Sequence, residues 1–259
     1  MHRPLKKLTT RVVREGQRLV VKYRPKKLHA FRIGIRRIRS ILKQIGSHKS
    51  RRFRKTWGGL NAITNDARDW DVFFITAEKL LSPEDFSEFE RLNHELTQSS
   101  HEAVVEMLQS MLWHRHIEEL QGYIQRSAEH TSGKELSLVS LDQALGKARL
   151  MLSQALTVDD ERSWHKFRIA VKDVRYVADA SIVSEDEAPY LEAVTNDCKS
   201  LQAALGNWHD ATIQMHMLED LEPAVVHVTL GADLEQRKQQ FLSQTREILA
   251  DSDVFTPVQ

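Results

Sequence analysis

Basic side chains recur at helical spacing in residues 28–43, LHAFRIGIRRIRSILK. On a helix that turns about 100° per residue, five of them share an arc of about 80°. We call this set the first stripe: His29, Arg32, Arg36, Arg39 and Lys43. Like charges on adjacent turns destabilise an isolated helix by roughly 0.2–0.5 kcal/mol per pair. Their repetition therefore favours an anionic ligand, and arginine is suited to phosphate because its planar guanidinium binds two oxygens at once.

The same pattern occurs again in residues 164–179, WHKFRIAVKDVRYVAD. Both copies fit H-x-x-R-x-x-x-[RK]-x-x-R, and the second stripe is His165, Arg168, Lys172 and Arg175. Beside each stripe runs an apolar arc, formed by Phe31, Ile35, Ile38, Leu42 and Ile45 in the first copy and by Phe167, Val171, Val174 and Ala178 in the second. A match on two adjacent helix faces indicates an internal duplication.

A weaker pair of similar segments accompanies the stripes. LNAITNDARDWDVF occupies residues 60–73, and LQAALGNWHDATIQ occupies residues 201–214. Gly206 of the second segment aligns with Asn65 of the first, and asparagine tolerates the left-handed turn that glycine favours. We therefore expect a turn in both segments and, in the second half, separate helices at about 188–206 and 208–220.

Two further positions of this pair are polar in both copies. Arg68 aligns with His209, and Asp69 aligns with Asp210. The two aspartates could either cap the following helix or hold a basic residue in place, and capping is the preferred interpretation.

LHAFRIGIRRIRS and WHKFRIAVKDVRY resemble the signature of the CHAD family, the conserved histidine α-helical domain. The segments at 60–73 and 201–214 resemble the family's second signature, a leucine-glycine turn followed by Arg-Asp. The resemblance covers essentially the whole chain. It implies an all-α fold of two pseudo-symmetric antiparallel helical bundles that flank a basic cleft, with inorganic polyphosphate as the ligand.

Charge is unevenly distributed along the 259 residues. Residues 1–55 contain 20 Lys and Arg residues and a single acid, Glu15, whereas the remainder contains 17 Lys and Arg against 35 Asp and Glu. Such segregation predicts a polyanionic partner for the basic part. The alternative is that acidic helices neutralise it within the protein.

The rest of the chain predicts helices and little else. Glycine and proline are few, and no long segment alternates with the period of a strand. Helices are expected at 4–22, at 26–46, from Ser82 to about 110, at 138–156 and from Pro223 to about 249. The polar segment 127–137 suggests a boundary between a first bundle at 1–130 and a second at 131–259.

Cysteine content and hydropathy indicate the compartment. The single cysteine, Cys198, excludes an internal disulfide framework and fits a reducing environment. No apolar run is long enough for a membrane span, and no signal peptide is visible. A cytoplasmic location is expected, with association to polyphosphate granules as a further possibility that the resemblance suggests.

Two more basic segments extend the predicted site. Residues 3–22 carry a stripe of their own, and a cluster lies at 49–55. The full set predicted to bind polyphosphate is His29, Arg32, Arg36, Arg39, Lys43, His165, Arg168, Lys172, Arg175, Arg11, Arg14, Arg18, Arg51, Arg54 and Lys55.

His29 and His165 admit three interpretations. They could be core histidines bonded to backbone, donors to a phosphate oxygen, or metal ligands. A metal site needs several converging ligands, and the surrounding arginines would repel a cation, so no metal and no cofactor is expected. Other pairs at helical spacing, such as His94 and His101, have no evident third ligand and are interpreted as ordinary histidines.

Catalysis finds little support in the sequence. Phosphoryl transfer usually needs a carboxylate-held metal or a positioned nucleophile. No P-loop motif occurs, and Asp66, Asp69 and Asp71 do not all share one helix face. We therefore expect a protein that is not an enzyme.

Three functions remain for the sequence to distinguish. The leading one is non-catalytic polyphosphate binding, which could serve attachment to granules or regulation of polyphosphate-metabolising enzymes. Nucleic-acid binding would use the same charges, but aromatic residues for base stacking are sparse near the stripes. A metal-chelating or phosphoprotein-docking module is the third.

Overall fold

The described part of the chain is entirely helical. The computed structural model describes residues 2–127, 138–179 and 185–255, which form ten α-helices and one short 3₁₀ helix and contain no strand. The prediction of an all-α fold is confirmed. The chain divides into two compact units, Met1–Lys134 and Glu135–Gln259. The boundary predicted at 130 and 131 lies outside the described residues, and the predicted symmetry and cleft between the bundles stay predictions.

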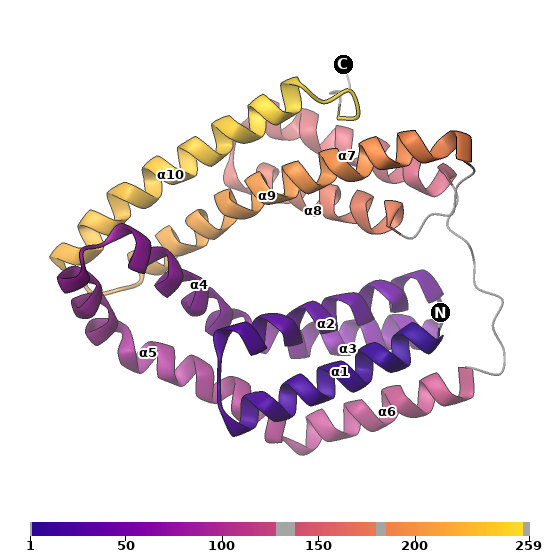
Figure 1. Cartoon of the computed structure of the whole chain (residues 1–259), viewed down its shortest axis with the longest axis horizontal. Coiled ribbons are helices and arrows are strands. Elements are labelled where there is room, and N and C mark those ends of the chain that lie inside the picture. Colours follow the sequence, from indigo (N-terminus) through magenta and orange to yellow (C-terminus); the bar gives the residue numbers. More distant parts are fainter. Residues whose placement is uncertain (1, 128–137, 180–184, 256–259) are drawn as a thin grey trace. The chain divides into compact units, whose positions relative to one another are not determined.

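The described residues of the first unit, 2–127, form six helices, which Figure 1 labels. Two of their ends follow the capping chemistry that the sequence indicates. Gly46 closes the second helix in a left-handed conformation, with φ of 68°, and the Ser82 side chain accepts a hydrogen bond from the Asp85 amide at the start of the fifth. The helices are α1 His2–Val21, α2 Pro25–Ile45, α3 His48–Ile63, α4 Asn65–Leu80, α5 Pro83–Gln109 and α6 Met111–Ser127.

Where the second unit is described, at 138–179 and 185–255, it forms four α-helices. Asp160 caps α8 by accepting a hydrogen bond from the Ser163 amide at 2.7 Å, as the polar segment 157–163 indicates. The elements are α7 Leu138–Val158, α8 Glu161–Ala178, the 3₁₀ helix η1 Glu185–Glu187, α9 Ala188–Glu219 and α10 Val225–Ala250.

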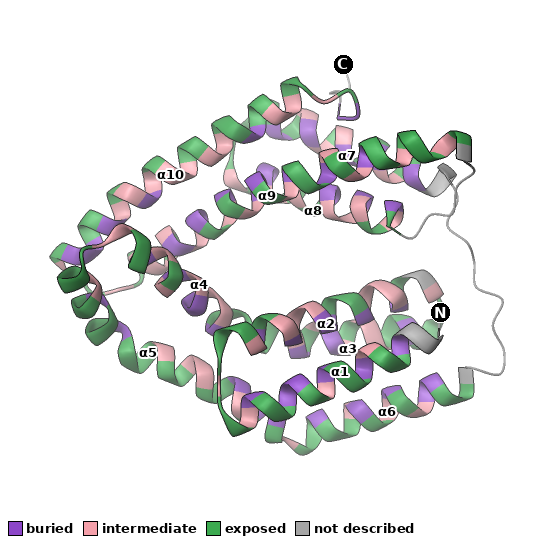
Figure 2. Cartoon of the chain, in the orientation of Figure 1, coloured by how far each residue is buried: buried purple, intermediate pink, exposed green. Residues whose placement is uncertain are grey.

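Each unit has its own hydrophobic core, and burial follows one side of most helices (Figure 2). In the first unit, the fully buried Phe31 of α2 packs against Trp113 of α6, and Trp57 of α3 lies against the same ring. In the second, Trp164 and Phe167 of α8 are buried, and Phe255 returns from beyond α10 to contact Phe167. The two apolar arcs predicted beside the stripes thus anchor α2 and α8 in separate cores.

The prediction of a turn at Gly206 is wrong. Residues 188–219 form one continuous helix, α9, with Gly206 inside it. A glycine within a helix costs about 1 kcal/mol relative to alanine, and burial of Leu205 and Trp208 on either side outweighs that cost.

In the first unit a break does occur, although without the expected left-handed residue. α3 ends at Ile63 and α4 begins at Asn65, and Thr64 between them has φ of −92° and ψ of 5°. The Thr64 hydroxyl donates back to the Asn61 carbonyl at 2.7 Å, which satisfies a carbonyl at the end of α3.

The contact between α1 and α2 depends on a small residue. Gly34 is buried in α2, and a Cβ atom there would collide with the side chain of Val12 in α1. We expect Gly34→Ala to destabilise the first unit by about 1–3 kcal/mol, the usual cost of overpacking. Denaturant unfolding monitored by circular dichroism measures the change.

Gly59 provides the matched control. It is exposed in α3, and a Cβ atom there meets nothing within 4 Å. Gly59→Ala should stabilise the protein by about 0.5–1 kcal/mol. Equal effects of the two substitutions would show that α1 and α2 do not pack at Gly34 as described.

Candidate anion-binding site

The first stripe flanks the buried face of α2. Phe31, Ile35 and Leu42 are fully buried, whereas His29, Arg36 and Lys43 are exposed. The exposure of His29 contradicts the interpretation of a core histidine. Arg32 and Arg39 are half-buried, because their side chains lean toward the neighbouring helices α3 and α4.

Arg32 is held at the junction of α3 and α4. Its Nη1 atom donates to the Asn61 carbonyl at 3.2 Å, to the Thr64 hydroxyl at 2.5 Å and to the Asn65 side-chain oxygen at 3.0 Å. Burial lowers the pKa of Arg32 to about 10, the nearby Asp69 opposes that shift, and Arg36 and Arg68 add to it. The guanidinium therefore stays charged at neutral pH while its orientation is fixed.

Arg39 and Arg54 lie toward the same side of α3. The Arg39 guanidinium lies against Gly58, where a Cβ atom would be 3.1 Å from Nη2. Arg54, Gly58 and Asn61 are spaced by four and three residues and therefore share one side of α3. Since Arg39 contacts Gly58 and Arg32 contacts Asn61, the half-buried Arg54 lies on the side of α3 that faces the first stripe.

Three arginines surround the imidazole of His29. Burial, followed by Arg68, Arg36 and Arg32, lowers the pKa of His29 below its ordinary value of 6.5. The imidazole is therefore neutral at pH 7. Because Arg68 belongs to α4, two helices of the first unit contribute to one concentration of positive charge. A bound anion would raise the pKa of His29, because it favours the charged form of the imidazole.

The second stripe has the same organisation on α8. His165, Arg168 and Lys172 are half-buried, and the His165 ring lies beside His209 of α9, with centroids 5.0 Å apart. Burial, then Arg168, His165 and Lys172, lowers the pKa of His209 to about 3. Burial and the same two cations, Arg168 and Lys172, also lower the pKa of His165.

Arg175 completes the second stripe through a neutral partner. Its Nη1 atom donates to the side-chain oxygen of Gln202 on α9 at 2.8 Å. The amide nitrogen of Gln202 donates in turn to the Val171 carbonyl at 3.5 Å, and Asp179 lies 3.7 Å from Nε of Arg175. Gln202 thus orients the arginine through a neutral hydrogen bond, and Asp179 adds an ion pair at the surface.

Arg14 and Arg18 of α1 lie apart from the first stripe. Glu15 is buried and lies near three cations, with Arg18 at 3.1 Å, Lys27 at 3.6 Å and Arg14 at 3.9 Å. Lys27 is two residues before His29, which places it about 160° around α2, at the edge of the apolar arc farthest from the stripe. Arg14 and Arg18 therefore line a separate basic pocket of about 500 Å³ with Lys27.

The remaining predicted residues are surface cations. Arg11, Arg51 and Lys55 are exposed. Arg51 is three residues before Arg54 and thus on the same side of α3, whereas Arg11 belongs to the outward face of α1.

Arg68 and His209 are site residues that the sequence prediction omitted. The signal was available, because the two align in the weaker repeat and both are basic. Their aspartate neighbours do not cap helices, which corrects the preferred interpretation. Asp69 lies inside α4 and Asp210 inside α9, and the attraction between Asp69 and Arg32 supports the other alternative, that Asp69 holds a basic residue in place.

The described residues form neither a metal-binding cluster nor a membrane-spanning helix. Among them, no group of three or more His, Cys, Asp or Glu side chains is placed to hold a metal ion. None of their helices combines the length and hydropathy that crossing a membrane requires.

Comparisons with known proteins identify the family. The model of the CHAD domain matches residues 5–219, so the chain belongs to the CHAD domain family. Among solved structures, the crystal structure of the CHAD domain from the plant Ricinus communis superposes with a TM-score of 0.65 at 22% sequence identity, covering 97% of this chain and 87% of that one. At this identity the likeness shows the fold alone. A search of curated proteins found no match.

The depressed pKa of His209 predicts a loss of stability in acid. His209 has a pKa of about 3 in the folded protein, against 6.5 when unfolded. Its contribution to the free energy of unfolding is therefore at its maximum above pH 6.5. That contribution decreases as the pH falls from 6.5 toward 3, because the unfolded state then binds the extra proton. His209→Gln should flatten the pH dependence of the unfolding temperature in this window, measured by calorimetry.

The control is His114→Gln, which changes an exposed histidine of the first unit. It should leave the acid dependence as in the unsubstituted protein. An unchanged acid dependence in His209→Gln would show that His209 is not held neutral by its surroundings.

Proposed function

We propose that this protein is a non-catalytic module that binds inorganic polyphosphate through the first and second stripes. The observation that carries the proposal is the repetition of one arrangement in two units. In each, a histidine, an arginine and a further cation follow one helix face, and a second helix adds Arg68 or His209. The CHAD resemblance in the sequence suggests the ligand.

The arrangement suits a flexible phosphate chain. Arg32 and Arg175 are already oriented by hydrogen bonds, so less side-chain entropy is lost when they bind an anion. Exposed Arg36 and half-buried Lys172 present charge beside them. Affinity would come from charge-assisted hydrogen bonds and from the release of counterions. A long chain that reaches both stripes would gain further affinity through effective concentration.

The same chemistry defines the rivals. A nucleic-acid backbone also carries regularly spaced phosphates, but Phe31 and Phe167 beside the stripes are fully buried and unable to stack on bases. The metal-chelating alternative is disfavoured because the arginines and lysine around His29 and His165 repel a metal cation. A docking role toward granules or polyphosphate-metabolising enzymes follows from the proposed ligand.

Each stripe helix carries one cation in the stripe and another outside it, and the two pairs give a matched test of the site. Arg36 belongs to the first stripe, whereas its exposed neighbour Arg37 is turned about 100° away. Lys172 and Lys166 form a similar pair on α8. We expect Arg36→Ala with Lys172→Ala to weaken binding of long-chain polyphosphate at least tenfold, since two charge-assisted contacts are lost.

Arg37→Ala with Lys166→Ala removes the same net charge away from the stripes. It should change the affinity less than threefold in the same titration. Comparable losses in the two double variants would mean that net charge alone, without the stripes, determines binding.

A salt series separates a phosphate-chain site from a general basic surface. Polyphosphate binding should persist at salt concentrations that abolish binding of single- and double-stranded DNA, because oriented guanidinium contacts are screened less than a diffuse field. Fluorescence anisotropy with labelled ligands measures both. Equal affinities with equally steep salt slopes would favour the nucleic-acid alternative.

A further inference from the structure

A groove between α4 and α5 is lined by acidic and apolar side chains. It has a volume of about 390 Å³, within the usual range for small-ligand sites. Three carboxylates line it, from Asp71, Glu78 and Glu90, and none of its described lining residues is Lys or Arg. This absence of cations contrasts with the basic segment 1–55 of the same unit.

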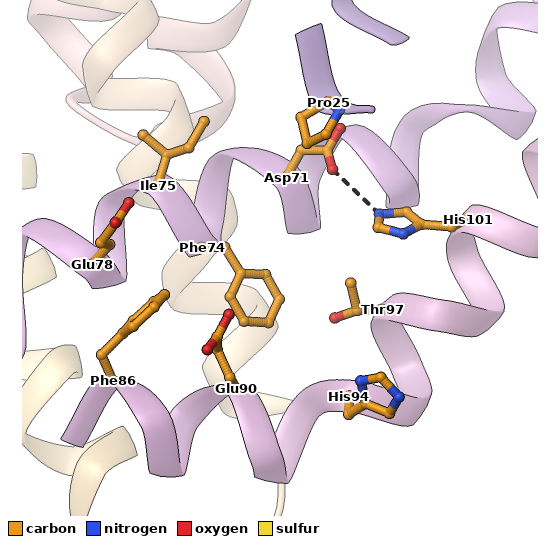
Figure 3. A pocket seen from close by; sticks show the side chains of 10 residues that line it. All are labelled: Pro25, Asp71, Phe74, Ile75, Glu78, Phe86, Glu90, His94, Thr97 and His101. Carbon is orange, nitrogen blue, oxygen red and sulfur yellow. Dashed lines mark hydrogen bonds and ion pairs between the residues drawn. The ribbon is translucent and has the colours of Figure 1, made fainter. Parts of the chain in front are cut away.

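Apolar side chains form much of the wall between these carboxylates. Phe74 from α4 and Phe86 from α5 meet edge to face, with ring centroids 6.3 Å apart. Figure 3 shows Phe74 and Glu90 projecting toward one another from the two helices. Aromatic faces attract cations, and they also cover methylene groups, so the groove combines two features that an alkylammonium recognises.

One end of the groove holds a fixed and buried carboxylate. Asp71 is 4% exposed, and its oxygens accept a hydrogen bond from the Tyr23 hydroxyl at 2.9 Å and contact Nε2 of His101 at 3.2 Å. Tyr23 and His101 stack with centroids 3.7 Å apart. The Asp71 side chain is only 1% exposed, so this network fixes a carboxylate that contributes negative charge to the end of the groove.

The spacing of the carboxylates indicates a chain and not a point charge. Asp71 and Glu78 are seven residues apart, which puts them on one face of α4 and about 10 Å apart along its axis. No three acidic, histidine or cysteine side chains among the described residues converge as a metal site requires. A ligand that satisfies these carboxylates therefore carries several separate cations joined by apolar links.

We propose that the α4–α5 groove binds a linear aliphatic polyamine. Its methylene segments lie against Phe74 and Phe86, its ammonium groups pair with the exposed Glu78 and Glu90, and the buried Asp71 adds negative charge at one end. The proposal is independent of polyphosphate binding, since none of these residues belongs to either stripe.

The test is calorimetric titration of spermidine into the full chain, purified free of polyanions. We expect saturable binding at one site, weakened at least tenfold by Glu78→Gln with Glu90→Gln. Both side chains are exposed, so the variant should fold, which circular dichroism verifies. Putrescine, with one cation fewer, should bind more weakly than spermidine.

The control is Glu95→Gln with Glu106→Gln, which removes the same charge from exposed positions of α5 turned away from the groove. It should change spermidine affinity less than twofold. The proposal is overturned by an absence of saturable binding, by an equal loss in the control, or by tighter binding of trilysine than of spermidine, which would indicate a peptide groove.

Discussion

Repulsion between cations on successive turns is the constraint on which the structure of α2 depends. The helix carries an apolar arc that must be buried and, directly beside it, a stripe that must stay hydrated or find partners. The structure meets both needs by attaching individual guanidiniums to neutral groups. Arg32 binds hydroxyl, amide and carbonyl oxygens at the α3–α4 junction, and Arg39 lies against Gly58. The hydrogen-bond partners of Arg32 are neutral and fix its orientation, and the nearby Asp69 adds an attraction.

The two units solve the same problem with different residues. In the first, the arrangement requires a break between α3 and α4, because Thr64 and the Asn61 carbonyl are available to Arg32 only where the helical hydrogen bonds are interrupted. In the second, α9 continues through the corresponding segment, and Gln202 supplies a side-chain acceptor to a different stripe residue, Arg175, the counterpart of Arg39. The first unit has an arginine, Arg68, where the second has His209, whose pKa burial and nearby cations lower to about 3. The duplicated surfaces therefore differ in charge.

Much of the fold could be predicted from periodicity. The apolar arcs beside Arg32 and Arg168 identify the buried faces of α2 and α8, and Gly46 and Ser82 mark helix ends through local chemistry. Prediction from the sequence was wrong where tertiary packing determines the local structure. Gly206 suggests a turn, but burial of Leu205 and Trp208 keeps the helix continuous. Asp69 has the residue type of a cap, and its role depends on Arg32, which is distant in sequence. Arg68 and His209 are recognisable as site residues only once α4 and α9 are placed against the stripes.

The buried thiol of Cys198 allows local opening of the second unit to be measured by thiol labelling. It is the single cysteine of the chain, it is fully buried in the core of that unit, and burial followed by the charge of Asp197 raises its pKa to about 12. A thiolate is the reactive species toward alkylating and disulfide reagents, so the folded unit resists labelling. Modification then requires local opening around α9, and its rate follows the population of opened molecules. Because the first unit contributes no thiol, labelling kinetics resolve the opening of one half of a duplicated protein without any engineered probe.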